Sequence, residues 1–421
     1  MRELTDGVER EDAVRKGVNT PDLRRSFWAL ADQGVLSIGN FATAILMARA
    51  LPQAAFGTYV LLLGILLFLN IFHLSLVANP LLIEGATRSG TNLQVFATTS
   101  ITLVAIGVSP LCAVASLAAL MLHQSTLIPW IVAGLFFWQI QETTRRVLLS
   151  QFRHREALWG DALSYLGQGS LLWLISREGR LTIQSVFVVI ALTSAAAAVV
   201  QSVQIRLAPT TIDNMRNLGA DFWRLGRWML LTSIVGFLTL QAFPWIVGIR
   251  LGVEDSASFQ AVATIVGVFN PVLFGVTNLV VVAAARAHRS AGVGAARHIA
   301  AVYGLQGIAF LMPCCLILIV WPRAVLTFLY GADSPYQRLQ TDLRLFTLAY
   351  LLVYIASIYI FLLGALGQSR AGFLAQFVGA VTVIVTALPL LSLLGLHGAV
   401  LCISFSAIVR GAIGARFVMR L

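Results

Sequence analysis

Five charged side chains lie inside stretches of this 421-residue sequence that are otherwise apolar. Asp32 stands near the start of one such stretch and Asp161 near the start of another. Between them, Glu142 precedes Arg145 and Arg146 by three and four residues, which places all three on one face of a helix. A charge at the centre of a bilayer costs at least about 2.5–3.5 kcal/mol, so charges kept there usually serve a function. These five residues are the first candidates for a site.

Two pairs of arginines at helical spacing indicate phosphate recognition. Arg145 with Arg146, and Arg224 with Arg227, each offer two guanidinium groups, which bind phosphate in a bidentate fork. We expect these four arginines to contact a substrate. Structural roles stay open for both pairs. The first pair can form ion pairs with Glu142 along one helix, and the second can reach lipid headgroups.

The carboxylates allow a different chemistry. Asp32, Glu142 and Asp161 are candidates for binding a coupling ion, H⁺ or Na⁺, or for gating, although each could instead pair with an arginine of a neighbouring helix. The amides Asn40 and Asn270 also lie inside apolar stretches. They are candidates for contacting substrate hydroxyl groups, with hydrogen bonding between helices as the alternative.

Two arginines mark the ends of apolar stretches. Arg49 and Arg250 end corresponding stretches in the two halves of the chain. We expect them either to anchor the protein at lipid headgroups or to form part of a gate.

Several kinds of site are not expected, because the sequence lacks the residues that they require. The four cysteines lie in apolar stretches without CxxC or Cys/His spacing, which predicts no disulfide framework and no metal site. The only lysine is Lys16, so the sequence has no nucleotide-binding GxxxxGK[ST] motif, and we expect no cofactor. The net charge of +11 is not gathered into a basic patch with interleaved aromatic residues, which argues against a nucleic-acid partner.

The candidate residues sit on elements of membrane-spanning length. Hydrophobic residues make up 58% of the chain and charged residues 11%, against about 25% charged in soluble domains. About 20 apolar residues cross a bilayer as a helix, and twelve blocks of that size occur. We predict an all-α integral membrane protein with about twelve transmembrane helices, at 27–48, 57–83, 94–121, 126–150, 157–176, 181–207, 222–249, 257–285, 294–320, 342–364, 371–393 and 397–420.

The basic residues orient these helices. Of the 29 arginines and lysines, 22 fall on the side of the N-terminal tail and 7 on the opposite side. Because basic residues are retained in the cytoplasm, both termini are predicted to be cytoplasmic.

An internal repeat divides the chain. Phe27-Trp28 and Phe222-Trp223 open the first and seventh blocks, and amides recur at Asn70 and Asn270. Each half holds six blocks, so both halves enter the membrane from the same side, and the two lobes should be related by a pseudo-two-fold axis along the membrane normal. The predicted organisation is a polar cytoplasmic tail and two lobes joined by a cytoplasmic linker, at 1–25, 26–207, 222–421 and 208–221 respectively.

Short motifs in the first half resemble those of a known family. They are Asp32-Gln33, Ser37, Asn40-Phe41, Ala48-Arg49, Leu51, Phe56-Gly57 and Tyr59, together with Gln141–Arg146, Phe152-Arg153 and Asp161–Leu163. These resemble bacterial polysaccharide exporters and lipid-linked oligosaccharide flippases of the multidrug/oligosaccharidyl-lipid/polysaccharide (MOP) exporter superfamily. The resemblance implies a MATE-like fold and a role in polysaccharide biosynthesis, with exopolysaccharide or lipopolysaccharide as the product.

The resulting prediction is a bacterial inner-membrane flippase that moves a lipid-linked oligosaccharide or polysaccharide precursor by alternating access. A cation-coupled multidrug or metabolite antiporter of the same fold is the alternative, and it would need an acidic site deep in one lobe. An intramembrane glycan ligase is disfavoured, because the longest outer gap, at about 321–341, offers Asp333 as its one acid and no histidine. The sugar, the lipid, the driving ion and the oligomeric state stay open.

Overall fold

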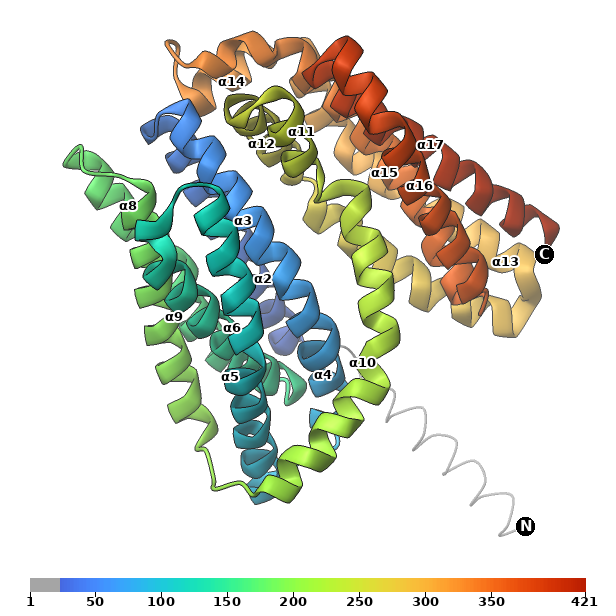
Figure 1. Cartoon of the computed structure of the whole chain (residues 1–421). Helices are drawn as coiled ribbons and strands as arrows, with labels where there is room; N and C mark the ends of the chain where they lie inside the picture. The colour runs from blue at the N-terminus through green and yellow to red at the C-terminus, as the bar shows by residue number, and fades with distance from the viewer. Residues whose placement is uncertain (1–22) are drawn as a thin grey trace, which may run out of the picture.

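In the computed structural model, residues 23–421 are described, and within that range every regular element is a helix (Figure 1). The predicted tail, 1–25, lies almost wholly outside the described residues. Each of the twelve predicted blocks is largely helical: the blocks 222–249 and 257–285 each cross a two-residue break between helices, and the blocks 257–285 and 294–320 share one kinked helix. The all-α fold class predicted from the sequence is therefore confirmed.

The first half of the chain forms six helical segments, two of which contain a π-helical turn. In the second segment the π turn covers Leu74–Ala78, and in the fifth it covers Ala162–Leu166. The helices of this half are α2 (Leu23–Ala50), α3 (Gln53–His73) continued by α4 (Asn79–Gly85), α5 (Gly90–Met121), α6 (Ile128–Ser150), α7 (His154–Asp161) continued by α8 (Gly167–Arg177), and α9 (Ile183–Ile205).

The second half also contains six long segments, and one short helix is added to them. Its helices are α10 (Ile212–Leu240) with α11 (Phe243–Leu251), α12 (Val253–Gly267), α13 (Asn270–Val320), the short α14 (Pro322–Tyr330), α15 (Gln340–Ala365), α16 (Ser369–Leu394) and α17 (Leu396–Arg420).

Proline and glycine explain where the segments of the second half bend. Pro244 and Pro271 each stand in the first turn of a helix that follows a break, where their missing N–H is tolerated. The axes of α10 and α11 differ by 44° across such a break. Gly292 has a φ of 80°, which divides α13 into the two predicted spans that meet there.

Seven helical segments within 23–421 are long and apolar enough by composition to cross a membrane, and the bent α10–α11 pair would be an eighth. The 51-residue α13 contains parts of two predicted spans. The remaining predicted spans include α2, α6 and α7–α8, which hold the five charged candidates. Their polar and charged residues make these three segments less apolar than the others.

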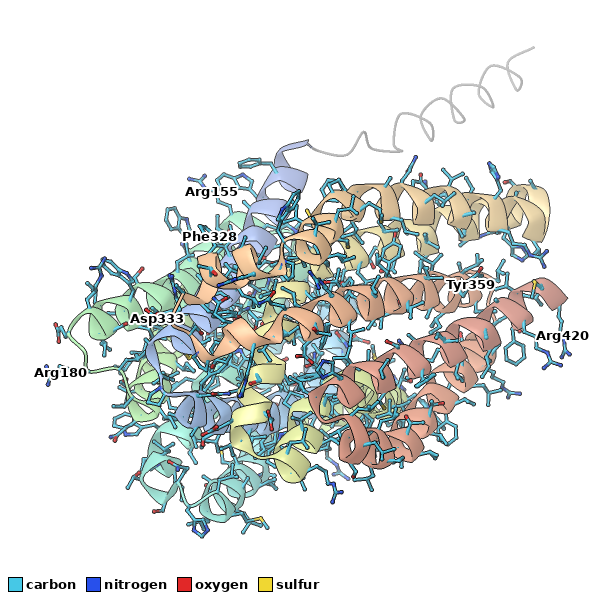
Figure 2. The ribbon with its side chains drawn as sticks, turned by 90° about the horizontal axis from the view of Figure 1, so that it is seen from above. Arg155, Arg180, Phe328, Asp333, Tyr359 and Arg420 are labelled. Carbon is cyan, nitrogen blue, oxygen red and sulfur yellow. The ribbon has the colours of Figure 1, made fainter. Side chains whose placement is uncertain are left out.

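The buried residues form one core that both halves share and two that they do not. We call α2 to α9 the N lobe and α10 to α17 the C lobe. The joined end is the end where α2 finishes and α3 begins. The largest core lies toward the joined end and contains residues of both lobes. Toward the opposite, separated end, one core contains N-lobe residues and the start of α10, and another lies within the C lobe. The lobes therefore meet at one end and part toward the other (Figure 1). Seen from above, Arg180 of the N lobe and Arg420 of the C lobe lie at opposite sides of the molecule (Figure 2).

Helix α10 connects the lobes along its length. Leu218 and Phe222 are buried in the N-lobe core, where the Phe222 ring meets Phe96 at 6.2 Å. The later part of α10 contacts α16 of the C lobe. Because α10 begins at Ile212, helix occupies most of the predicted linker 208–221, and the start of α10 packs on the first lobe.

Candidate functional site

The structure gathers the five charged candidates into one cluster inside the N lobe. Arg145 of α6 lies at its centre and contacts three carboxylates. Its Nε is 2.5 Å from Oδ2 of Asp161, its Nη2 is 2.8 Å from Oδ2 of Asp32, and its Nη1 is 3.6 Å from Oε2 of Glu142. These acids come from α7, α2 and α6, so Arg145 ties three helices together.

Arg146 completes the cluster. Its Nε lies 2.5 Å from Oε1 of Glu142, an i,i+4 pair along α6. Three carboxylates thus meet two guanidinium groups, which leaves one negative charge in excess when every group is ionised.

The side chains of the cluster are largely buried. Asp161, Asp32 and Arg145 are 0%, 3% and 6% exposed, whereas the Arg146 side chain is 21% exposed. Removing one partner of a buried ion pair usually costs about 3–5 kcal/mol, because the remaining charge is left uncompensated. All three carboxylates of the cluster therefore depend on the Arg145 guanidinium.

Neutral side chains of α6 and α9 support the charged ones. Gln201 donates to Oδ1 of Asp161 at 3.4 Å and accepts from the Thr144 hydroxyl at 2.8 Å. Gly160 makes room for Gln201, since a Cβ at that position would collide with the amide. Sequence reasoning missed Gln201, although a glutamine within the apolar stretch of α9 was a usable signal.

Two buried acceptor atoms near the cluster have no hydrogen-bond partner among the described residues. One is Oδ1 of Asp32 and the other is Nδ1 of His73. His73 Nε2 lies 2.8 Å from the Thr143 hydroxyl, which is also 2.7 Å from the Gln139 carbonyl; when the hydroxyl donates to that carbonyl, His73 Nε2 is the donor to Thr143. That tautomer leaves Nδ1 as an acceptor. A free carboxylate oxygen and a free imidazole nitrogen can each accept a proton, and the carboxylate can also bind a small cation.

Local backbone features place these groups. The π turns begin directly after His73 and directly after Asp161, and π turns often occur at functional sites. Gly39 of α2 packs against the second turn, where a Cβ would lie only 2.8 Å from Cβ of Tyr165. This close approach brings α2, and with it Asp32, up to α7.

The other candidate substrate residues lie outside the cluster. Asn40 is exposed on α2, and Asn270 is exposed at the start of α13, where it accepts from the Tyr350 hydroxyl at 3.0 Å. On α10, Arg224 pairs with Asp221 at 2.9 Å with 71% of its side chain exposed. Arg227 is exposed, with its guanidinium 5.7 Å from the Trp228 ring.

Both gating arginines lie at the joined end. Nη2 of Arg49 donates to the Phe328 carbonyl of α14 at 3.5 Å, a contact between the lobes. Nη2 of Arg250 donates to the Ser392 hydroxyl at 2.6 Å, a contact within the C lobe. The two residues that the repeat makes equivalent therefore have different partners.

The lobes close on each other at the joined end through α3 and α12. The Gln53 amide donates to the Glu254 carbonyl and to the Ser258 hydroxyl, at 3.0 Å in each case. Gly57 lies so near the Val253 carbonyl that any side chain there would clash.

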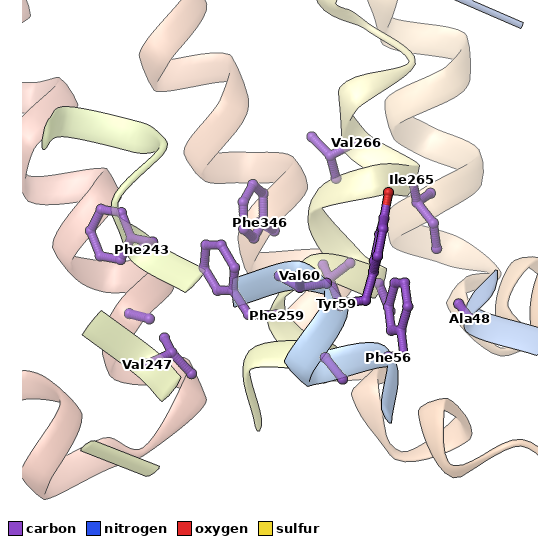
Figure 3. Close-up of a cluster of buried hydrophobic side chains, with 14 of the residues drawn as sticks. Ala48, Phe56, Tyr59, Val60, Phe243, Val247, Phe259, Ile265, Val266 and Phe346 are labelled. Carbon is purple, nitrogen blue, oxygen red and sulfur yellow. The ribbon is translucent and has the colours of Figure 1, made fainter. Parts of the chain in front are cut away.

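Behind this contact, Phe56 and Tyr59 of the N lobe share a core with Phe243, Phe259 and Phe346 of the C lobe (Figure 3). Phe259 is 5.8 Å from Phe243 and 5.4 Å from Phe346, measured between ring centroids. These buried aromatic side chains of both lobes therefore pack together at the joined end.

Solved structures with the same fold include flippases and drug transporters. "Lipid II flippase MurJ, inward closed conformation" superposes with a TM-score of 0.72 at 14% identity, covering 93% of this chain and 87% of that one. "Inward-facing conformation of a multidrug resistance MATE family transporter of the MOP superfamily" gives a TM-score of 0.70 at 14% identity, over 93% and 98%. The chain therefore has the MurJ/MATE fold. No family model matches the sequence, and no curated protein matches it.

A third solved structure has the same fold. An outward-facing MATE family transporter of the MOP superfamily gives a TM-score of 0.63 at 14% identity, covering 94% of each chain.

Proposed function

We propose that this protein is a transporter of the bacterial inner membrane that works by alternating access between its two lobes. The observation that carries this proposal is the division of the core, which both lobes share at the joined end and which is separate in each lobe at the other. With both termini in the cytoplasm, the separated end faces the cytoplasm, and the lobes part alternately at the separated end and at the joined end to admit and release cargo.

The proposed cargo is a lipid-linked oligosaccharide or a related polysaccharide precursor. Its pyrophosphate needs cationic groups that are free to bind it, and Arg224 and Arg227 are exposed on the helix that bridges the lobes. Asn40 and Asn270 are exposed on α2 and α13, where they can meet sugar hydroxyls. Arg145 is held by three carboxylates in this conformation, so its contact with substrate requires a rearrangement of the cluster.

A cation-coupled antiporter is the second candidate, and the N-lobe cluster favours it. The cluster brings the carboxylates of Glu142, Asp32 and Asp161 together inside the N lobe. It has one negative charge in excess when every group is ionised, and one carboxylate oxygen has no hydrogen-bond partner among the described residues. Binding of H⁺ or Na⁺ there would balance the charge, so the same cluster can couple either cargo to an ion gradient.

Reconstitution into liposomes separates the two candidates. Flipping of a polyprenyl-pyrophosphate oligosaccharide is read from its accessibility to an impermeant glycosidase, and antiport is read from efflux of a fluorescent cationic drug driven by a pH or Na⁺ gradient. We expect glycan flipping by the wild type and by the control Arg286→Gln/Arg289→Gln, whose two arginines are exposed. Drug efflux without flipping would select the antiporter, and the absence of both activities would reject the transport proposal.

A further inference from the structure

The C lobe contains a buried arginine whose charge is not neutralised. Arg410 of α17 is 4% exposed. It lies about 21 Å from the start of α17 and about 15 Å from its end at 1.5 Å per residue, which is deep inside the lobe. In contrast to Arg145, Arg410 has no carboxylate within ion-pair distance among the described residues.

The sequence explains why no counter-charge reaches it. Between residue 343 and the C-terminus there is no aspartate or glutamate. Asp342, the last acid of the chain, stands in the first turn of α15 at the joined end. Measured along the helix axes at 1.5 Å per residue, Asp342 therefore lies about 18 Å closer to the joined end than Arg410 does.

The surroundings of Arg410 offer hydrogen-bond donors in excess. Its Nη1 donates to Oε1 of Gln376 on α16 at 2.8 Å, and this is the one hydrogen bond that Arg410 makes in the described part of the chain. Its Nε is buried without a partner. The Gln376 amide nitrogen, held beside the guanidinium by the same contact, donates to no atom within residues 23–421. The Arg410 guanidinium thus has N–H groups for which the described residues supply no acceptor.

The local packing is built around the arginine. A Cβ on Gly379 would collide with Cγ and Cδ of Arg410, so glycine at this position makes room for the arginine side chain. The Ser406 hydroxyl donates to the Gly379 carbonyl at 3.0 Å and fixes the spacing of α16 and α17. Space and helix spacing are both adapted to a charge that has no protein counter-ion.

We propose that Arg410 and Gln376 form a binding site for a small anion of the chloride class. Burying an unpaired charge is strongly unfavourable, and a bound anion supplies the missing acceptor together with the missing charge. Guanidinium suits this role because it is weakly hydrated and offers several N–H groups in one plane. The site is independent of the cargo proposed above, since it lies in the other lobe from the carboxylate cluster and its test measures anion binding alone.

Chloride binding to the purified full-length protein tests this site. We would measure ³⁶Cl⁻ binding by scintillation proximity, and thermal unfolding in chloride against gluconate at constant ionic strength. We expect saturable binding and chloride-dependent stabilisation in the wild type. Arg410→Met should abolish both, and Gln376→Leu should weaken chloride binding at least about tenfold, the effect of losing a hydrogen bond to a charged partner.

The matched control is Arg416→Met, which removes an exposed arginine of the same helix and should leave chloride binding unchanged. If Arg410→Met does not yield folded protein, chloride binding is measured with Gln376→Leu and Arg410→Lys instead. Both variants should bind chloride more weakly than the wild type. Competition identifies the source of the anion. Displacement of chloride by phosphatidylglycerol but not by inorganic phosphate would assign the site to a lipid headgroup, and displacement by neither supports chloride. Absence of saturable chloride binding in the wild type, or equal binding in Arg410→Met, would overturn the proposal.

Discussion

Replacing Arg145 with glutamine should destabilise the N lobe more than any other single change in the cluster. The guanidinium lies 2.5, 2.8 and 3.6 Å from three carboxylates, two of which are 0% and 3% exposed. Removing one partner of a buried pair costs about 3–5 kcal/mol, and here the acids left behind also repel one another. With an unfolding entropy of about 2.1 cal/mol/K per residue, this corresponds to a fall in Tm of about 3–6 °C.

A second substitution separates lost charge balance from lost packing. In the double variant Arg145→Gln/Asp161→Asn, one of the carboxylates that lost its cationic partner is replaced by a neutral amide. Because the two residues interact directly, their effects should not add, and we expect the double variant to regain about 1–3 kcal/mol relative to Arg145→Gln.

The assay is thermal unfolding of the detergent-purified protein, followed by tryptophan fluorescence. The control Arg286→Gln removes an exposed arginine and should change stability by less than about 0.5 kcal/mol. Stability of Arg145→Gln equal to that of the wild type, or a double variant less stable than the single one, would show that the cluster is not held by this guanidinium.

Three further outcomes follow from the same structure. Gly57→Val should force α3 away from the Val253 carbonyl and open the joined end, seen as faster labelling of a cysteine placed at Ser258; unchanged labelling would contradict the close contact. Arg224→Gln/Arg227→Gln should reduce flipping of a pyrophosphate-linked glycan about tenfold or more, with partial rescue by lysine, which keeps the charge but loses the planar fork. A reporter fused to the C-terminus should be active only if it is an enzyme that works in the cytoplasm; activity of a periplasm-dependent reporter would reverse the orientation.

Much of the fold could be predicted from block length alone. Each span is a long run of apolar residues whose backbone must form helix in lipid, and no tertiary information is needed to see this. The exact breaks were harder to place. Pro244 and Pro271 signal helix starts, but the bend between α10 and α11 and the kink of α13 at Gly292 depend on packing between helices.

The members of the cluster could be predicted, but their arrangement could not. The Glu142–Arg146 pair follows from spacing along one helix. The contacts of Arg145 with Asp32 and Asp161 join three helices, and a single sequence carries no signal for which faces meet. Arg410 illustrates the same limit. The charge count places it with the cytoplasmic basic residues, whereas the structure buries it well inside α17.

Cross-linking the joined end tests alternating access most directly. Gln53→Cys and Ser258→Cys replace two side chains that touch across the lobes, and a short reversible thiol cross-linker would tie α3 to α12. The control pair Thr327→Cys/Gln337→Cys joins two neighbours within the C lobe, whose side chains are in contact at 3.2 Å. Both pairs are introduced into a transport-competent variant that lacks the four native cysteines.

We predict that cross-linking the first pair stops glycan flipping in liposomes and that reduction restores it, while cross-linking the control pair has no effect. Full transport with the joined end covalently closed would contradict the claim that the lobes must part there during each cycle.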